Sequence, residues 1–383
     1  MLPLTYAIRN LFRNKTRLAQ TVGGSALVVL LVIAAAALNN GMKQVLSASG
    51  SPLNAILLGT GSEESIQRSE VAERTAGIAA AGVAGISQPL GTPAVSTEIH
   101  YMTFLETSGK SRSQGLFRGV TPQALLTHPE VRLIDGTFPQ AGELMAGKLA
   151  WRKLGLSPED LKPGTKVKLD GAEMTISGTF AAPGTVMESE IWATLSDIRM
   201  LAQRETVSCI VLRLEHPDDF TEADLFSKQR LDLELTALRE SDYYAHLSQF
   251  FSPLRIMTWI TAGLVAAGAL FGGLNTLYAA FASRIKELAT LQAIGFTRLA
   301  ILASLIQESL LATLTGTLLA SAIALFLLDG QTIPFSIGAF TVTITPAIAV
   351  IGLVTGTLLG VIGALPPAIR CLKPPLPSAL RSA

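Results

Sequence analysis

Polar and apolar stretches alternate along this chain, and four of the apolar stretches are long enough to cross a membrane as helices. A helix rises about 1.5 Å per residue, so roughly 20 apolar residues cross a hydrocarbon core of about 30 Å. Glu308 is the only charged residue within these four stretches. The stretches lie at residues 19–38, 257–282, 300–328 and 346–369.

The long polar stretch between the first two predicted spans has the pattern of a globular α+β domain. Turn signals such as Pro163-Gly164 and Asp170-Gly171 separate short apolar runs from stretches with helical periodicity. A second lobe is expected from an insertion near residues 87–132. The short runs predict strands at residues 54–58, 98–105, 166–169, 174–180 and 209–214. The periodic stretches predict helices at residues 65–80, 147–154 and 219–238.

The composition agrees with a division into membrane helices and a soluble domain. Hydrophobic residues make up 49% of the 383 residues and charged residues only 15%, whereas soluble domains carry about 25% charged residues. The net charge of +1 offers no field that would attract nucleic acid, so no such partner is expected. Cys209 and Cys371 are too few for a disulfide framework or a closed zinc site, and we interpret both as structurally incidental.

Basic residues predict the orientation of the spans, because cytoplasmic loops of membrane proteins are enriched in Lys and Arg. They precede the first span, lie between the second and third, and follow the fourth, whereas residues 329–345 contain none. Both termini are therefore expected in the cytoplasm, and residues 39–252 outside it. The basic residues of these segments are Arg9, Arg13, Lys15, Arg17, Arg284, Lys286, Arg298, Arg370, Lys373 and Arg381.

The first span has an alternative interpretation as a signal peptide. A basic start, an apolar core and small residues at positions 35–37 also describe a cleaved secretion signal. The apolar run is long once residues 18–24 are included, and this favours a retained helix. Either interpretation places residues 39–252 outside the cytoplasm.

The segment before the first span predicts an amphipathic helix. Leu4, Ile8, Leu11 and Phe12 recur at helical spacing, and Pro3 suits a first helical turn. Arg9 and Arg13 occupy other faces of this helix. Such a helix lies in the membrane interface with its basic residues towards lipid headgroups, so Arg9, Phe12 and Arg13 are the candidate lipid-contacting residues.

The linker between the second and third spans predicts a short cytoplasmic helix. Residues 284–298 are too polar to enter lipid, and Ile285, Leu288, Ala289 and Gln292 share one helical face. Gly295 is placed to end the helix in a left-handed conformation. The apolar positions need a surface to cover, either on the chain's own helices or on a partner.

Glycines spaced four residues apart predict close helix packing within the membrane. Gly268 and Gly272 are one such pair, and Gly352, Gly356 and Gly360 form a second series. The spacing leaves two interpretations open. The glycines pack helices of one chain together, or they form the seam of a dimer.

The linker and the helix after it resemble the MacB/FtsX-like ABC permeases, a family that includes LolC and LolE. The family pattern R-x-x-E, then L-x-A-x-G, then a glutamate in the following helix reads here as Arg284, Glu287, Leu291, Ala293, Gly295 and Glu308. The segments at residues 7–18 and 366–381 resemble the family's opening and closing segments, and residues 135–180 resemble its periplasmic domain. The order of one helix, a large outer domain and three helices is also that of the family.

The resemblance implies a four-helix membrane bundle with an α+β extracytoplasmic MacB-like domain, and no catalytic residue in this chain. Two permeases would sit on a separate cytoplasmic ABC ATPase that binds ATP and Mg²⁺, and the linker would be its coupling helix. A periplasmic adaptor or substrate-binding protein is a further partner that the resemblance allows. The candidate coupling residues are Arg284, Lys286, Glu287, Leu288, Leu291, Ala293, Gly295 and Phe296.

The implied function is export or extraction of an envelope substrate (a drug, peptide, lipid or lipoprotein) at the inner membrane. The alternative is FtsX-like signalling to an extracytoplasmic partner. Glu308, as an ionisable residue inside a span, is expected either to be functional or to bond a neighbouring helix. The expected parts are a cytoplasmic helix at 1–18, spans at 19–38, 253–283, 299–328 and 346–369, the outer domain at 39–252, the coupling helix at 284–298, an outer loop at 329–345 and a cytoplasmic tail at 370–383.

Other candidate sites do not have the pattern that their chemistry needs. Residues 142–148 nearly spell a phosphate-binding loop, but Leu149 stands where a hydroxyl would hold magnesium, and a turn followed by a helix is the better interpretation. The acidic pairs at 63–64 and 218–219 are expected in solvent. No metal ligands are expected, because the histidines lack ligand spacing and are interpreted as surface or loop residues. They are His100, His128, His216 and His246.

Overall fold

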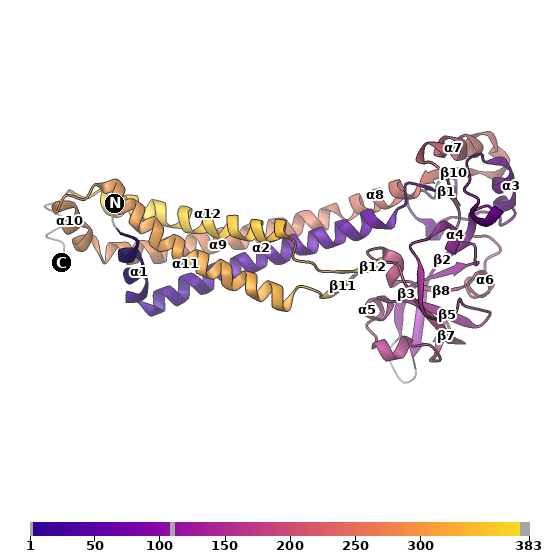
Figure 1. The fold of residues 1–383 in the computed structure, drawn as a ribbon, viewed down its shortest axis with the longest axis horizontal. Coiled ribbons are helices and arrows are strands. Elements are labelled where there is room, and N and C mark those ends of the chain that lie inside the picture. The colour runs from indigo at the N-terminus through magenta and orange to yellow at the C-terminus, as the bar shows by residue number, and fades with distance from the viewer. Residues whose placement is uncertain (1–2, 108–111, 376–383) are drawn as a thin grey trace. The chain divides into compact units, whose positions relative to one another are not determined.

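The computed structural model describes residues 3–107 and 112–375, which form two compact units (Figure 1). The helical unit comprises the described residues within 1–40, 253–331 and 342–383. The sheet unit is drawn from residues 41–252 and 332–341. Residues 376–383, the end of the predicted tail, lie outside the described residues.

Four of the described helices are long and apolar enough to cross a membrane. They are α2 (Lys15–Ser49), α9 (Ser252–Ala282), α11 (Arg298–Leu327) and α12 (Pro346–Leu372). All four predicted apolar stretches fall on these helices, with only Leu328 beyond the end of α11. Helix α2 continues well past residue 38, where the polar sequence begins, and runs through Gly41 to Ser49, before Gly50 and Pro52. The helical unit also contains two short helices, α1 (Leu4–Arg13) and α10 (Ile285–Ala293).

The sheet unit is built on a ten-stranded sheet whose strands occur in the order β10-β1-β9-β2-β3-β8-β5-β7-β4, with β6 pairing β2 and β7. The parallel pairs are β3–β8 and β5–β7, and the other pairs are antiparallel. The strands are β1 (Asn54–Gly59), β2 (Val95–Thr107), β3 (Ser113–Val120), β4 (Arg132–Gly136), β5 (Glu143–Gly147), β6 (Lys166–Leu169), β7 (Ala172–Ala181), β8 (Ile191–Thr194), β9 (Cys209–Arg213) and β10 (Leu235–Arg239).

The long strand β2 belongs to two parts of this sheet. Its first residues, Val95–Glu98, pair with β9, and its later residues pair with β3 and β6. Because β6 also pairs with β7, the strands β2, β3, β8, β5, β7 and β6 close into a ring. Of the remaining strands, β9, β1 and β10 extend from the other edge of β2, and β4 pairs with β7.

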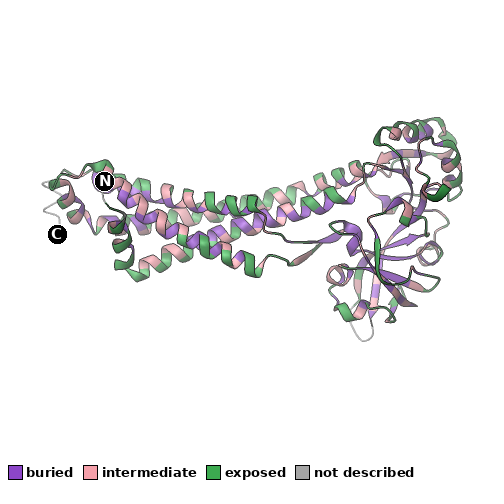
Figure 2. Ribbon diagram, viewed as in Figure 1, coloured by how far each residue is buried: buried purple, intermediate pink, exposed green. Residues whose placement is uncertain are grey.

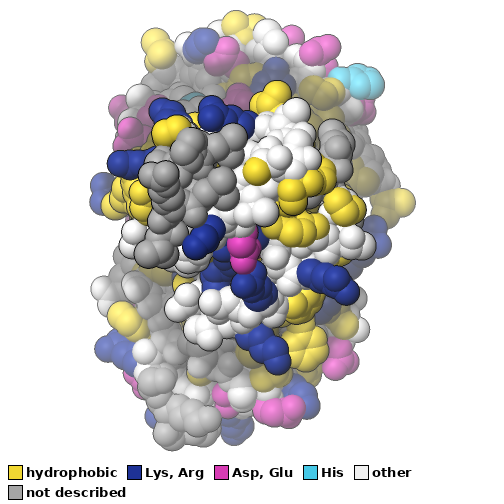
Figure 3. Space-filling view, turned by 90° about the vertical axis from the view of Figure 1, so that its left-hand side faces the viewer, with side chains coloured by type: hydrophobic (Ala, Val, Ile, Leu, Met, Phe, Trp, Pro, Cys, Tyr) yellow, Lys and Arg dark blue, Asp and Glu magenta, His cyan; other side chains and the backbone are white. Residues whose placement is uncertain are grey.

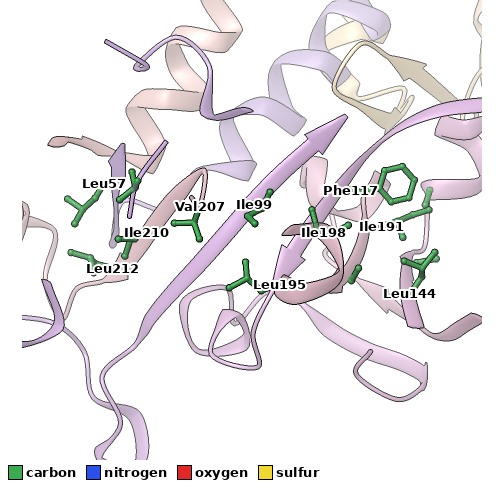
Figure 4. Packing of buried hydrophobic residues seen from close by; sticks show 14 of the residues in the cluster. Leu57, Ile99, Phe117, Leu144, Ile191, Leu195, Ile198, Val207, Ile210 and Leu212 are labelled. Atoms are coloured by element: carbon green, nitrogen blue, oxygen red, sulfur yellow. The ribbon is translucent and has the colours of Figure 1, made fainter. Parts of the chain in front are cut away.

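Helices cover this sheet and enclose its apolar core. Ile99 and Phe117 on the strands pack with Leu195 and Ile198 on α6, and all four side chains are buried (Figure 4). Figure 2 shows buried residues along the strands and exposed ones along much of the membrane-length helices. Burying one large apolar side chain contributes about 1.5–3 kcal/mol. The helices are α3 (Thr75–Gly82), α4 (Ala124–Thr127), α5 (Ala150–Leu154), α6 (Leu195–Ala202), α7 (Phe220–Gln229) and α8 (Glu240–Phe250).

The predicted strands are all observed, but the predicted helices of this unit were partly wrong. The helix predicted at 219–238 ends at Gln229, and Leu235–Arg239 is strand β10, which pairs with β1. The left-handed Glu234, with φ of 48°, separates the two elements. The helix predicted at 65–80 begins only at Thr75, because Val71 forms an extended bridge to Val207. Strand β5 occupies most of the 142–148 segment, where a turn and helix were expected.

The segment between α11 and α12 was predicted as a loop, and it contains a hairpin of β11 (Thr332–Phe335) and β12 (Gly338–Thr341). This hairpin belongs to the sheet unit. Lys153 Nζ donates to the carbonyl oxygens of Phe335 and Ser336 at 2.6 and 2.9 Å, and burial lowers the pKa of this amine. The Ala339 amide donates to Ser189 Oγ at 2.8 Å. The hairpin is therefore held by directed contacts and not by its own two strands alone.

Replacing Lys153 with methionine should loosen the hairpin while leaving the rest of the sheet unit folded. Hydrogen bonds from a charged donor contribute about 1.5–3 kcal/mol, which corresponds to roughly 10- to 100-fold faster amide exchange. Hydrogen exchange followed by mass spectrometry should show this change at residues 332–341. Lys162→Met is the matched control, because Lys162 is exposed and pairs only with the exposed Glu159. Unchanged exchange in Lys153→Met would show that the apolar contacts alone hold the hairpin.

Candidate functional site

The linker forms the short helix α10, and its ends are fixed by local sequence. Arg284 stands at its N-terminus, and the helix ends at Ala293. Gly295 has a φ of 109°, a conformation that residues with a side chain rarely adopt, and the Phe296 amide donates back to the Leu291 carbonyl. The Thr297 side chain then accepts from the Ala300 amide and caps α11. The predicted helix end at Gly295 is confirmed.

One face of α10 is buried against the other helices, and the rest is open. Leu288 and Ala289 are buried, and Leu288 packs in a cluster with Phe281 and Ile301. Leu291 and Phe296 pack at the edge of this cluster. Of the remaining candidate coupling residues, Lys286, Ala293 and Gly295 are exposed.

Exposed apolar and basic side chains lie next to one another at this end of the helical unit. Ile294 is 71% exposed and Leu299 is 75% exposed, although both are large and apolar. Lys and Arg side chains gather on the same end, beside hydrophobic ones (Figure 3). The exposed basic residues of the linker and the flanking segments are Arg9, Arg13, Lys15, Lys286, Arg298, Arg370 and Lys373.

Five charged residues from four elements form one ion-pair network beneath α10. Arg284 Nη1 lies 3.0 Å from Glu308 Oε2, and Arg284 Nε lies 3.3 Å from Glu287 Oε2. Arg13 Nη1 lies 2.6 Å from Glu287 Oε1, and Arg17 forms an ion pair with Glu308. We call these residues (Arg13, Arg17, Arg284, Glu287 and Glu308) the linker network.

The linker network has a buried part and an exposed part. The side chains of Arg284 and Glu308 are only 10% and 5% exposed, whereas Arg13 and Glu287 are largely open to solvent. Burial opposes the charge of Arg284, but Glu308 outweighs burial and raises the pKa of the guanidinium. For Glu287, the slight effect of burial is outweighed by hydrogen bonds from Arg13 and Arg284, which lower its pKa. Both linker residues therefore stay charged.

Four of these five residues were singled out from the sequence, and Arg17 was missed as a site residue. The sequence contained a signal that could have identified it. Glu308 lies within an apolar helix, so its carboxylate requires a cation nearby. Arg17 stands one turn into α2, and the structure brings it to Glu308.

Helix α1 is observed at Leu4–Arg13 with an amphipathic pattern, and part of its predicted apolar face packs against the chain itself. Ala7 and Leu11 are buried, whereas Ile8 and Phe12 are exposed to the extent of 39% and 61%. Arg9 is also exposed. The exposed apolar side chains leave a surface suited to the membrane interface, and contact of Arg9, Phe12 and Arg13 with lipid stays a prediction.

The two series of glycines have different surroundings in the structure. A β carbon added at Gly352 would lie 2.8 Å from Ile33 Cδ1 of α2, and one at Gly356 would overlap Thr317 of α11. Gly360 likewise faces Thr313. At Gly268 and Gly272 nothing lies within 4 Å of such a carbon. The α12 series therefore packs helices of this chain, while a dimer seam at Gly268 and Gly272 stays a prediction.

Gly356→Ala should destabilise the helical unit by about 1–3 kcal/mol, because the added methyl forces α11 and α12 apart. Gly268→Ala is the matched control, since it has free space and gains up to about 1 kcal/mol of helix propensity. Thermal unfolding in mild detergent should give a lower midpoint for Gly356→Ala only. Equal midpoints for the two variants would contradict close packing at Gly356.

The sheet unit contains a second group of charges that includes two of the four histidines. The prediction that the histidines are surface or loop residues was wrong for His100, which is buried on β2, whereas His128 lies in the loop after α4 and is also buried. Arg118 donates to both carboxylate oxygens of Glu190, at 2.7 and 2.8 Å, and to Glu98 Oε2 at 2.8 Å. His128 Nε2 lies 3.0 Å from Glu98 Oε1. All of these side chains are buried, because β2 and its neighbours place them beneath the sheet. We call Glu98, His100, Arg118, His128 and Glu190 the buried charge cluster.

Mutual pairing keeps most of this cluster charged despite burial. Burial alone would raise the pKa of Glu98, but His128 and Arg118 outweigh burial and hold that pKa well below its usual value. Burial alone would lower the pKa of His128, but Glu98 and Glu130 outweigh it and raise the pKa to about 10. For His100, burial and the charge of Arg118 lower the pKa, so its imidazole is neutral. Apart from Glu98 and His100, which are two residues apart on β2, the residues of the cluster are far apart in sequence, which explains why spacing did not reveal the cluster.

Two family matches decide what kind of protein this is. The MacB-like periplasmic core domain matches residues 18–224, more than half of the chain, and the FtsX-like permease C-terminal family matches residues 259–376. The chain belongs to the MacB/FtsX-like permease family. The resemblance seen in the linker and in the outer domain is thereby confirmed.

Solved structures with similarity to this permease come from the outer domains of related proteins. The periplasmic region of MacB from Actinobacillus actinomycetemcomitans is 10% identical, with a TM-score of 0.39, and the match covers 54% of this chain and 97% of that one. The extracellular domain of the noncanonic ABC-type transporter YknZ from Gram-positive bacteria is 14% identical, with a TM-score of 0.36, and the match covers 48% and 99%. No curated protein matches the chain.

Membership of the family places this permease in the inner membrane with a periplasmic domain. A permease of this family is the membrane component of an ABC transporter and not the ATPase itself. The family also implies an ATPase partner and dimerisation. The α+β character of the outer domain agrees with the sheet unit described above.

Proposed function

We propose that this permease transmits ATPase-driven motion through its helices to the periplasmic domain, for export or extraction of an envelope substrate. In this proposal α2, α9, α11 and α12 cross the membrane, and both termini are cytoplasmic. Helix α10 is then the element that docks on the ATPase, and the sheet unit is periplasmic. ATP and Mg²⁺ belong to the partner.

The linker network is the single observation that supports transmission best. Any displacement of α10 moves Arg284, which is ion-paired with Glu308 of α11, and Glu308 is in turn paired with Arg17 of α2. Helix α2 is continuous to Ser49 and so carries motion at its start along its whole length. Ion pairs of low exposure resist separation, because separating either pair would leave an uncompensated charge.

The chemistry of the exposed surface indicates what the ATPase must offer. Ile294 and Leu299 need an apolar groove, because large exposed apolar side chains at an interface gain most when they fill a pocket. Lys286 and Arg298 are exposed on the same linker, so the rim of this groove should carry acidic residues. Glu287 is occupied by Arg13 and Arg284 and is less available to a partner.

The test is co-purification of the tagged permease with its ATPase in mild detergent, using wild type, Ile294→Asp and Arg9→Asp. Ile294→Asp should reduce the recovered ATPase at least tenfold, because it places a charge in the apolar contact. Arg9→Asp is the control, since it changes the charge of the same end but lies outside α10.

Recovery of no ATPase with the wild type would refute the proposal. Undiminished recovery with Ile294→Asp would remove α10 as the docking element. An ATPase that co-purifies and is stimulated by a periplasmic protein partner, with no substrate moved, would favour the signalling alternative.

A further inference from the structure

Three side chains that can ligate a metal lie together between strands β2 and β9. Glu98 and His100 are two residues apart on β2 and therefore point to the same face of the sheet. Cys209 on β9 lies directly opposite Glu98 in the ladder. One ligating atom from each of the three residues lies within 4.8 Å of the other two, and all three residues are buried.

His100 has an unused ligating atom within this group. Its Nε2 is buried and makes no hydrogen bond of ordinary length within the described residues; it has an electrostatic contact with Glu98 Oε2 at 3.6 Å. The backbone amide of His100 donates to Ser208 Oγ, and the Ser208 amide donates to the Glu98 carbonyl, which fixes both strands at this point. A buried polar atom without a partner costs about 1–3 kcal/mol, so an additional ligand at this nitrogen would remove that cost.

The thiol of Cys209 is the second unused ligand. Cys209 is free and almost fully buried, so no disulfide competes for its sulfur. A sulfur–metal bond of about 2.3 Å and a nitrogen–metal bond of about 2.0 Å together span roughly 4.3 Å. The donor atoms of the three residues lie within 4.8 Å of one another, a separation that an ion bound to both a sulfur and an imidazole nitrogen can bridge.

The charges around the site decide which class of ion fits. Arg118 is paired through two hydrogen bonds with Glu190, and Glu98 is paired with His128 and Arg118. The charges of these four residues sum to zero, and the carboxylates of Glu130 and Glu240 lie at the other nitrogen of His128, 3.5 and 4.0 Å from Nδ1. A divalent ion beside Glu98 would therefore add charge to a locally balanced region that solvent does not reach. A monovalent ion that replaces the thiol proton adds none. Thiolate and neutral imidazole are also soft ligands that favour such ions over hard ones.

We propose that Cys209 and His100, with Glu98 beside them, form a binding site for a soft monovalent cation, Cu⁺ or its analogue Ag⁺. On binding, the Cys209 S–H bond is broken and its proton leaves to solvent. A sulfur–metal bond forms, and His100 Nε2 donates its lone pair to the same ion. No oxidation or reduction is involved. The bound ion links β2 to β9 and so stabilises the sheet unit, independently of the transport role proposed above.

The experiment titrates Ag⁺ into the purified full-length protein in detergent and follows both bound silver and the thermal unfolding midpoint. The starting protein is Cys371→Ser, which removes the only other thiol. It should bind one Ag⁺ tightly and unfold at a midpoint higher by several degrees. Adding Cys209→Ser should abolish both effects. Adding His100→Asn should weaken Ag⁺ binding at least tenfold, because one of two ligands is lost.

The controls separate loss of the site from loss of folding. Each variant is first unfolded without metal, and Cys209→Ala replaces Cys209→Ser if the serine variant does not fold. Equal silver binding with and without Cys209 would overturn the proposal, as would unchanged affinity in His100→Asn. Tighter binding of Zn²⁺ than of Ag⁺ by the Cys371→Ser protein would overturn the choice of a monovalent ion. Cu⁺, protected from oxidation and used in place of Ag⁺, should give the same order of binding affinities among the variants.

Discussion

Arg118→Met should lower the free energy of unfolding of the sheet unit by about 3–5 kcal/mol. Methionine fills a similar volume, but it leaves the buried carboxylate of Glu190 without its main cation and that of Glu98 with His128 in place of two cations. Removing one partner of a buried ion pair has this large effect because the remaining charge is no longer compensated. For a domain of this size, about 2–4 °C per kcal/mol predicts a midpoint lower by roughly 10 °C.

The measurement is thermal unfolding of the full-length protein followed by tryptophan fluorescence. Trp192 is a suitable probe, because it is buried and its Nε1 lies 3.2 Å from Glu190 Oε2. Arg112→Met is the matched control. Arg112 is 56% exposed, and its ion pairs with Glu106 and Asp170 are long, so its loss should cost no more than about 1 kcal/mol. Similar midpoints for the two variants would mean that the buried charge cluster adds little to stability.

Glu308→Gln should have a comparable effect on the helical unit, about 3–5 kcal/mol. The substitution keeps the shape of the side chain but leaves Arg17 and Arg284 facing each other around a neutral amide. In the proposed topology this position lies within the membrane, where unpaired charge is costly. We expect reduced yield of folded protein and a midpoint about 10 °C lower in detergent.

A double variant distinguishes charge balance from loss of packing. Glu308→Gln combined with Arg17→Gln removes one charge of each sign, so it should recover a large part of the stability lost in Glu308→Gln alone. Arg284 keeps its contact with Glu287 in both variants. If the double variant is less stable than either single one, the Arg17–Glu308 pair contributes through its hydrogen bonds and packing and not through charge balance.

The apolar pattern was sufficient to predict the helices of membrane length, because such a helix is recognised from the hydropathy of its own residues, without knowledge of what it packs against. The same holds for the strands at 54–58 and 209–214, whose continuous apolar runs are buried on both faces. The helix predicted at 219–238 shows the limit of this reasoning. Leu235–Arg239 is compatible with either helix or strand, and its pairing with β1, a partner distant in sequence, decides for strand.

The charged sites show the same limit. The linker residues Arg284 and Glu287 could be identified because they and Glu308 lie within one short stretch of sequence. The buried charge cluster could not be identified in this way, since Glu98 on β2, Arg118 on β3 and Glu190 just before β8 meet only in the folded sheet. A histidine such as His128 has the same local sequence signature whether it lies in solvent or beneath a sheet.

The β11–β12 hairpin has a consequence for biosynthesis. It is part of the sheet unit, yet it follows residues 41–252 of that unit only after α9, α10 and α11. Chains are synthesised from the N-terminus at roughly 5–20 residues per second, so most of the sheet is translocated and begins to fold before its last strands exist. In the proposed topology, the contacts of Lys153 and Ser189 with the hairpin form only after α11 has crossed the membrane. In that topology a chain stalled before residue 332 would leave the hairpin-binding face of the outer domain uncovered.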